Sequence, residues 1–197
     1  MWVNQEAEPS ASKTGWSTTS GRLLAGVPAR PSASSGQTVG YSFASDGPSH
    51  AVLFDNGTVL DLGIPAGGTE SIALGVNNRG QAVGFASYQL GPQAVLFENG
   101  RATLLGMLPG FIASRAFSIN NRGQIVGDVI DSNGIHHAVL FQDGRIIDLH
   151  SFIIDRLNST AWSINDLGEI VGSASDSSGG YAPLWKPVRS PADPDGN

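Results

Sequence analysis

The sequence predicts an all-β protein, a small β-propeller of four blades with four antiparallel strands in each. Three observations predict it. A phrase of the form G-Q/E-x-V-G returns four times, an apolar run follows each phrase, and an Asn-Gly or Asp-Gly pair follows three of these runs. The phrases begin at Gly36, Gly80, Gly123 and Gly168, so the period is 43 to 45 residues. A repeat of this length is one supersecondary unit that buries its apolar faces only by stacking on its neighbours.

The composition excludes several classes of protein. Of the 197 residues, 40% are hydrophobic and 14% are charged, which is typical of a folded domain and not of a disordered chain. A net charge of −6 without a basic cluster argues against nucleic acid as a partner. No apolar run approaches the length of a membrane-spanning helix, so we expect no membrane insertion. The lack of cysteine excludes disulfides, thiolate zinc sites and cysteine nucleophiles.

The third unit shows the strand pattern most clearly. Its four strand-like runs are residues 116–120, 124–130, 137–141 and 145–149, and turn residues separate them. The Asn-Gly or Asp-Gly pairs at 56–57, 99–100 and 143–144 predict tight hairpins, because both residue types tolerate positive φ. The run before each pair reads AVLF, or APLW in the fourth unit, and is apolar on both sides of a strand. We therefore expect both faces of each sheet to be covered.

The two ends of the chain predict ring closure. The fourth unit lacks the final turn and strand, whereas residues 21–28 form an orphan run that resembles the last strand of the first unit, residues 57–65. We expect this N-terminal strand to complete the last blade, which would remove the exposed sheet edges. A β-solenoid or an open array of hairpins is the alternative.

The predicted organisation is a single repeat domain at 21–188. Its units are approximately 33–65, 70–108, 114–152 and 159–188. We expect a polar N-terminal tail at 1–20 and a disordered C-terminal tail at 189–197.

These motifs resemble the HAF family of extracellular repeats. The resemblance rests on INNRGQIVG, on the closing Asn-Gly turn, and on His50-Ala51-Val52 and His137-Ala138-Val139, and it covers roughly residues 33–186. Ala33 and Ser34 depart from the Asn-Asn of the pattern, and Gln93 and Tyr181 replace its histidine. The resemblance implies a bacterial protein that is extracellular or periplasmic, and it implies no defined reaction. We expect no intact signal peptide in the chain as given, because residues 1–15 have neither a basic start nor an apolar segment; a signal that had been removed would leave the same sequence.

Asparagine is the leading candidate metal ligand. Asn77, Asn120 and Asn165 occupy one repeat position, and Asp166 follows the last of them. On a propeller axis their oxygens would converge and suit Ca²⁺, a cation that prefers oxygen ligands. The alternative is structural, because asparagine before a tight turn bonds to its own backbone.

The histidines and aromatic residues give further candidates. His137 and His50 are possible general bases, because imidazole titrates near neutral pH. His136 and His137 are adjacent on a strand and point to opposite faces, so they cannot bind one ion together. Trp162, Tyr181 and Trp185 gather in the fourth unit and could form a stacking platform for a sugar, with core packing as the alternative.

Two functions of different class remain open. The first is an exported binding module for a glycan, a small molecule or a protein, with or without Ca²⁺ on its axis. The second is a Ca²⁺-dependent lactone or ester hydrolase with its site at the mouth of the propeller channel. The regular repetition favours the binding module, because acid, base and nucleophile need different environments and catalytic sites therefore break a repeat.

Overall fold

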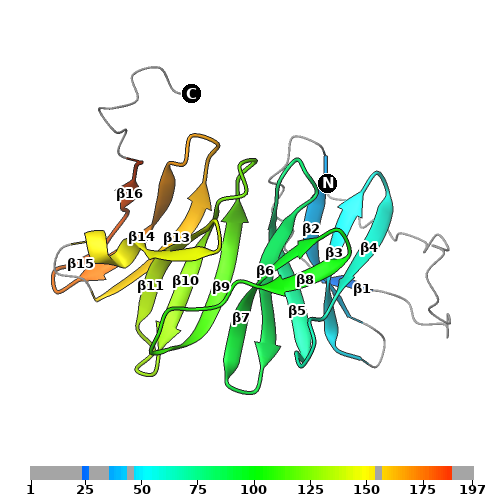
Figure 1. Ribbon diagram of the computed structural model, residues 1–197, viewed down its shortest axis with the longest axis horizontal. Coiled ribbons are helices and arrows are strands. Elements are labelled where there is room, and N and C mark those ends of the chain that lie inside the picture. The colour runs from blue at the N-terminus through cyan, green and yellow to red at the C-terminus, as the bar shows by residue number, and fades with distance from the viewer. Residues whose placement is uncertain (1–23, 27–35, 44–46, 154–156, 188–197) are drawn as a thin grey trace, which may run out of the picture.

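The computed structural model describes residues 24–26, 36–43, 47–153 and 157–187. These residues form an all-β protein of four antiparallel sheets, as the sequence predicts. The sheets stand side by side in chain order, with the first at one end of the stack and the fourth at the other (Figure 1). The tails at 1–20 and 189–197 lie outside the described residues.

Each sheet is built from consecutive strands. The first contains β1 (Leu24–Gly26), β2 (Thr38–Phe43), β3 (Ser49–Asp55) and β4 (Thr58–Gly63). The second contains β5 (Glu70–Val76), β6 (Ala82–Tyr88), β7 (Gly91–Glu98) and β8 (Arg101–Leu104). The third contains β9 (Phe111–Ile119), β10 (Ile125–Asp131), β11 (His136–Gln142) and β12 (Arg145–Asp148), followed by a 3-10 turn at Leu149–Phe152. The fourth contains β13 (Asn158–Ile164), β14 (Ile170–Asp176), β15 (Gly179–Tyr181) and β16 (Leu184–Trp185).

The repeated glycine phrase has a physical cause at both of its glycines. The first glycine of each phrase has φ between 71° and 82°, which favours glycine in the turn before the second strand. At the second glycine of the last three phrases, a β-bulge brings the preceding strand very close. A Cβ atom on Gly84 or Gly127 would collide with the backbone carbonyl of Ile72 or Arg115. In the last three units the phrase is therefore a turn followed by a close backbone contact.

The predicted hairpins are confirmed. Asn56, Asn99 and Asp143 have φ of 48°, 51° and 52°, and the glycine after each also has positive φ. Two consecutive residues with positive φ are typical of the turn whose twist matches paired strands. These turns connect β3 to β4, β7 to β8 and β11 to β12.

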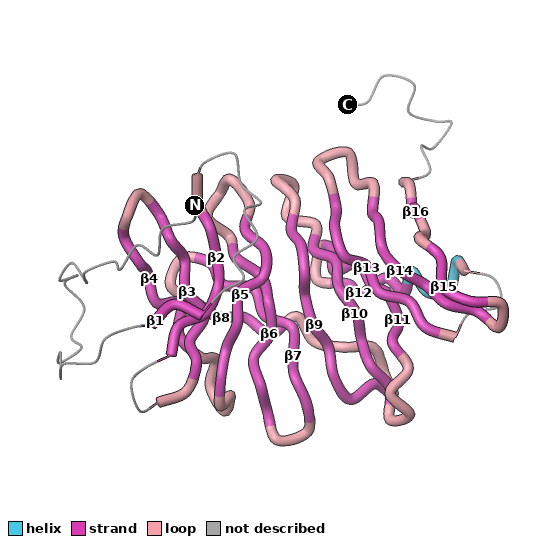
Figure 2. The backbone as a smooth tube through the Cα atoms, turned by 180° about the vertical axis from the view of Figure 1, so that it is seen from behind, coloured by secondary structure: helices cyan, strands magenta, loops and turns pink. Residues whose placement is uncertain are grey.

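The core lies between neighbouring sheets. β5 packs on β2 and β3, β9 packs on β6 and β7, and β13 packs on β10 and β11. The valine of each of the first three phrases, Val39, Val83 or Val126, is 0% exposed because the next sheet covers it. Figure 2 shows the resulting row of sheets from behind. Each sheet is therefore buried mainly by its neighbours along the chain.

The fourth sheet has an interrupted third strand. β15 and β16 both pair with β14, and Pro183 lies in the gap between them. Proline has no N–H to donate to a strand ladder, so the strand divides there.

The predicted ring closure is wrong in one definite respect. β1 pairs with β2 in the first sheet, with Leu24 opposite Phe43, and does not complete the fourth sheet. The first phrase already forms a second strand, so the first sheet lacked a first strand, and β1 supplies it. Among the described residues no strand of the fourth sheet packs extensively on the first, and the stack is open.

No helix among the described residues is long and apolar enough to cross a membrane.

Candidate functional site

The repeated asparagine joins neighbouring sheets. Asn120 Oδ1 accepts the backbone N–H groups of Arg122 and Gln124, both at 3.0 Å. Its Nδ2 donates to Gln124 Oε1 at 2.7 Å and to the carbonyl of Asn165 in the next sheet at 3.0 Å. Asn77 repeats this arrangement, and its Nδ2 donates to the carbonyl of Asn120 at 3.0 Å. We call these contacts the asparagine row.

A second set of contacts runs beside the asparagine row. The N–H of Asn78 donates to Asn121 Oδ1 at 2.9 Å, and the N–H of Asn121 donates to Asp166 Oδ1 at 2.8 Å. Asn121 Nδ2 also donates to Asp166 Oδ2 at 2.8 Å. The backbone N–H of Asn121, followed by its side chain, holds the pKa of the Asp166 carboxyl below its ordinary value. The third and fourth sheets therefore each supply acceptors to the sheet before them.

These contacts do not fit the predicted calcium ring. An amide oxygen has two lone pairs, and Oδ1 of Asn77, Asn120 and Asn165 each accepts two backbone N–H groups. Among the described residues no group of three His, Asp or Glu side chains is placed to hold a metal ion. The geometry supports the structural alternative for these asparagines, and we derive no chemistry through calcium.

The two predicted histidines lie on different sheets, and each meets an aspartate. His50 Nδ1 lies 2.9 Å from Asp61 Oδ2, and His137 Nδ1 lies 3.4 Å from Asp148 Oδ2. The His137 ring also stacks on His150, with 3.9 Å between ring centroids. The two histidines are therefore not brought together.

Among the described residues, a charged cluster around a fully buried carboxylate occurs only in the third sheet. Asp128 of β10 is 0% exposed, and its neighbour across the ladder is Arg115 of β9. Arg115 Nε donates to Asp128 Oδ1 at 3.0 Å, and Arg115 Nη2 donates to Oδ2 at 2.7 Å. His136 Nδ1 lies 2.8 Å from the same Oδ2, and Thr160 Oγ1 of the next sheet lies 3.4 Å from it. A buried carboxylate needs such partners, because desolvation of an isolated charge is costly.

Two groups of the cluster compete for one ring nitrogen of His136, and the tautomer of the ring decides which of them it binds. His136 Nδ1 lies 3.2 Å from Arg115 Nη2 as well as 2.8 Å from Asp128. The guanidinium only donates and an ionised carboxylate only accepts, so Nδ1 serves one partner at a time. The backbone N–H of His136 donates to Asn158 Oδ1 at 3.0 Å, which fixes the strand beside β13. His136 and His137 contact different partners, as their predicted opposite orientations require.

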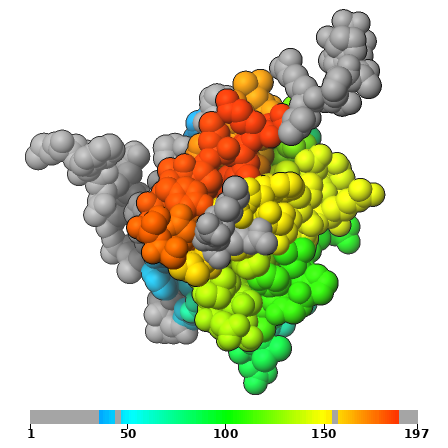
Figure 3. All heavy atoms as spheres, turned by 90° about the vertical axis from the view of Figure 1, so that its left-hand side faces the viewer, coloured from blue at the N-terminus to red at the C-terminus, as the bar shows by residue number. Residues whose placement is uncertain are grey.

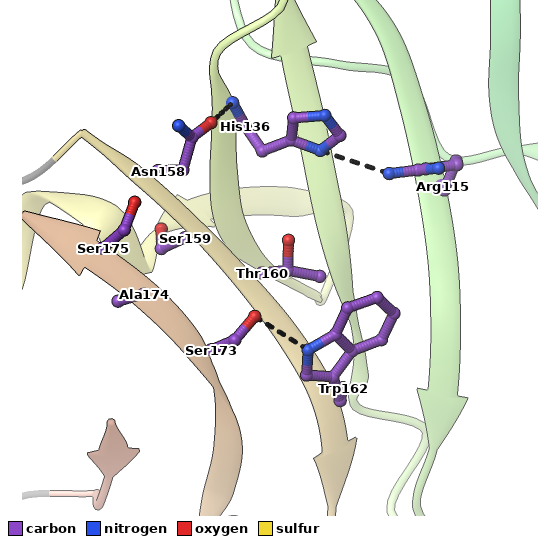
Figure 4. A pocket seen from close by; sticks show the side chains of 9 residues that line it. All are labelled: Arg115, His136, Asn158, Ser159, Thr160, Trp162, Ser173, Ala174 and Ser175. Atoms are coloured by element: carbon purple, nitrogen blue, oxygen red, sulfur yellow. Dashed lines mark hydrogen bonds between the residues drawn. The ribbon is translucent and has the colours of Figure 1, made fainter. Parts of the chain in front are cut away.

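The cluster borders a cavity of about 400 Å³. Figure 4 shows Arg115 and His136 on one side of the hollow and Trp162 on another. The Trp162 side chain is 45% exposed and donates from Nε1 to Ser173 Oγ at 2.9 Å. The remaining lining residues are small or polar: Asn158, Ser159, Thr160, Ala174 and Ser175.

An aromatic row leads into this cavity. The rings of Phe117 and Trp162 lie 4.7 Å apart at 39°, and the Arg115 guanidinium carbon lies 5.3 Å from the centre of the Phe117 ring. The contact with arginine is a cation–π interaction within the usual range. The cavity thus combines an accessible aromatic face with a fixed guanidinium.

The other two predicted aromatic residues lie elsewhere. Trp185 donates from Nε1 to the Leu149 carbonyl at 3.1 Å and packs against the core between the third and fourth sheets. Tyr181 lies in β15 and is 40% exposed, but it does not line the cavity. Of the three aromatic candidates, the structure places Trp162 alone in the cavity.

Sequence reasoning missed Arg115, Asp128 and His136, although a signal was present. Asp128 follows the second glycine of its phrase, where the other units have Tyr41, Phe85 and Ser173. Asp128 is thus the only charged residue at this position of the repeat. Such a departure from the repeat is a signal, because the groups of a functional site need different environments. The pairing of Arg115 with Asp128 depends on strand register, which the sequence pattern did not supply.

No protein-family model matches the chain, and no curated protein matches it. The resemblance to the HAF repeat family therefore stays a prediction.

Proposed function

We propose that the protein is an exported, propeller-like repeat module that binds a glycan in the cavity between β9, β13 and β14. The observation that carries this proposal is the break in the repeat at Asp128, where the other units have an uncharged residue. Arg115, Asp128 and His136 form a polar cluster that has no counterpart in the other sheets as far as the structure describes them, and it borders the accessible face of Trp162.

The chemistry of the cavity suits a polyhydroxylated ligand. A sugar ring presents a C–H face that can pack on an aromatic ring, and hydroxyls that need oriented hydrogen-bonding partners. Trp162 supplies the ring, and Asn158, Thr160 and Ser175 supply amide and hydroxyl groups around it. A small number of fixed polar groups on a partly apolar wall is typical of a ligand pocket.

Arg115 is the principal orienting group. Its guanidinium has five N–H donors in a planar fork, and its two hydrogen bonds to Asp128 use the Nε and one Nη2 hydrogen. Its side chain is 28% exposed, whereas that of Asp128 is 0% exposed. Asp128 is therefore a positioning residue, and Arg115 is the group that meets the ligand.

The test is a glycan array probed with labelled protein. We expect a defined set of glycans to bind the native chain and Trp162→Ala to reduce that binding at least tenfold, because the packing surface is lost. Phe152→Ala is the matched control, since Phe152 is an aromatic residue that is 70% exposed and lies outside the cavity. Binding that survives Trp162→Ala, or no glycan binding by the native chain, would refute the proposal.

The Ca²⁺-dependent lactone or ester hydrolase stays the second candidate. The His50–Asp61 and His137–Asp148 pairs favour it, because a carboxylate on Nδ1 orients an imidazole that acts as a general base. The asparagine oxygens give calcium little support. Hydrolysis of an ester and lactone panel that EDTA abolishes, and a melting temperature that rises with added Ca²⁺, would favour this function over glycan binding.

A further inference from the structure

The fourth sheet repeats an apolar pair that is buried in the first sheet and buried or half-buried in the second and third, but here both residues are exposed. In the first three sheets a valine of the second strand faces a leucine of the third. These cross-strand pairs are Val39 with Leu53, Val83 with Leu96, and Val126 with Leu140. Their counterparts, Val171 and Leu184, also face each other and are 49% and 54% exposed.

The buried interfaces between sheets also share a hydrogen bond from a backbone N–H of the third strand, and the fourth sheet has the corresponding residue. Within the stack, the N–H of Ala51, Ala94 or Ala138 donates to a serine hydroxyl of the next sheet, at 2.8 to 3.0 Å. Ala182 holds the same repeat position in the fourth sheet and is exposed. The fourth sheet thus carries one half of an interface that forms three times within the chain.

This end of the molecule forms a continuous surface. Figure 3 faces it, and the atoms of β14, β15 and β16 cover a large part of the view. We propose that Val171, Ala182 and Leu184, which we call the end face, bind a second copy of this chain, with the two end faces meeting about a twofold axis. Exposed apolar patches of this kind mark association sites.

The choice of the same face on both copies follows from the other end of the stack. Ala51 and Leu53 of β3 pack toward the second sheet, so Val52 between them points away from it. Val52 is nevertheless 0% exposed, so the far face of the first sheet is not accessible to a partner at Val52. A head-to-tail contact would therefore meet a covered surface, whereas the end face is exposed on every copy.

A twofold contact also matches the polar groups around the end face. Two sheets pack face to face about 10 Å apart, so valine and leucine of both copies would be buried together. Glu169 and Lys186 form an ion pair at 3.1 Å beside the end face. About a twofold axis, the acid of one copy can approach the base of its partner, which gives opposite charges at the rim.

Sedimentation velocity over a concentration series tests this proposal. We expect the native chain to sediment as a dimer and Val171→Lys to sediment as a monomer, because each interface would then bury two unpaired lysines. Leu60→Lys is the matched control, since Leu60 in β4 is also 54% exposed but lies in the first sheet. A circular dichroism spectrum checks that each variant keeps its strands.

A second variant keeps the test decisive. The chain has no cysteine, so Ala182→Cys introduces a unique thiol near the proposed axis. Mild oxidation should give a disulfide-linked dimer much faster than for Leu90→Cys, which lies in the turn before β7 and is 84% exposed. A native chain that stays monomeric, a dimer that survives Val171→Lys, or oligomers that lengthen with concentration would each overturn the proposal. Val171 and Leu184 do not line the cavity, so none of these results bears on glycan binding.

Discussion

The side chain of Asn120 closes its own turn and joins two sheets at the same time. Two backbone N–H groups and one carbonyl in the next sheet depend on it, and it is 4% exposed. One residue type at one position therefore explains both the tight turn and the contact between successive sheets from the second to the fourth.

Asn120→Ala should lower the free energy of unfolding by about 2–4 kcal/mol, because it leaves buried donors and an acceptor without partners. Urea denaturation measures this loss. Asn133→Ala is the control: Asn133 lies in an exposed turn and bonds only within that turn, so we expect a change within about 0.5 kcal/mol. Equal losses in the two variants would contradict the bridging role of the asparagine row.

Asp166 should make the folded protein less stable as the pH falls into the acid range. Its pKa is lowered in the folded state by the N–H and side chain of Asn121, so its contribution is present above the ordinary value of 3.8. That contribution is lost as the pH falls through the lower folded-state pKa. Asp166→Asn should lower the melting temperature at pH 7 slightly, because the contribution of the carboxylate is lost, and should make the fall below about pH 4 shallower, so that the two proteins converge in acid. An acid limb identical to that of the native chain would show that Asp166 is not linked to folding.

At the residue scale, the sequence identified which residue types matter better than it identified which residues contact each other. The asparagines were singled out correctly as repeated positions, but their oxygens bond to turns rather than standing free for a metal. Arg115 and Asp128 are 13 residues apart, and cross-strand register alone makes them neighbours. The order of residue types along the chain does not show where a bulge shifts the pairing of two strands, so it does not predict that Arg115 faces Asp128.

Among the elements, the second strand of each of the last three units depends on its glycine. Gly127→Ala should cost more than about 3 kcal/mol, beyond the usual penalty of an overpacked core, because the new Cβ meets the backbone of Arg115 and Ala116. Gly180→Ala in β15 is the control, since its nearest contact would lie at 3.8 Å. Thermal unfolding followed by circular dichroism measures both variants. A Gly127→Ala protein as stable as Gly180→Ala would contradict the close approach at the bulge.

The predictable elements are those with local signals. Asn-Gly and Asp-Gly turns depend on two neighbouring residues, so the hairpins follow directly from the sequence. The short strand β1 has no such signal. A run of a few apolar residues between glycines fits either edge of a sheet, and its pairing with β2 is decided by which sheet lacks a first strand.

For the whole molecule, an open stack implies unequal stability along the chain. The second and third sheets are covered on both faces, whereas the end of the fourth is exposed at Val171. In stacked repeats each unit is stabilised mainly by its neighbours. Native-state hydrogen exchange should therefore protect β6, β7 and β10 most strongly, and β14 and β15 least. Equal protection of β14 and β10 in the isolated monomer would indicate a closed ring.

The ring closure was the least predictable feature at this scale. Repetition shows that units stack, but the angle between successive sheets decides whether the last meets the first, and that angle depends on packing along the inner strands. In the structure, β9 contacts β5 on one side and β13 on the other, and these contacts set the angle between the sheets.

The central claim is that the third sheet breaks the repeat to form a binding site. The most direct measurement is a titration of the ¹⁵N-labelled protein with the glycans that the array selects, followed by ¹H–¹⁵N spectra. We predict saturable shifts of the Trp162 indole N–H and the Arg115 Nε–H, with the resonances of the first sheet unchanged. Shifts confined to other sheets, or saturation without change at Trp162 and Arg115, would contradict the account.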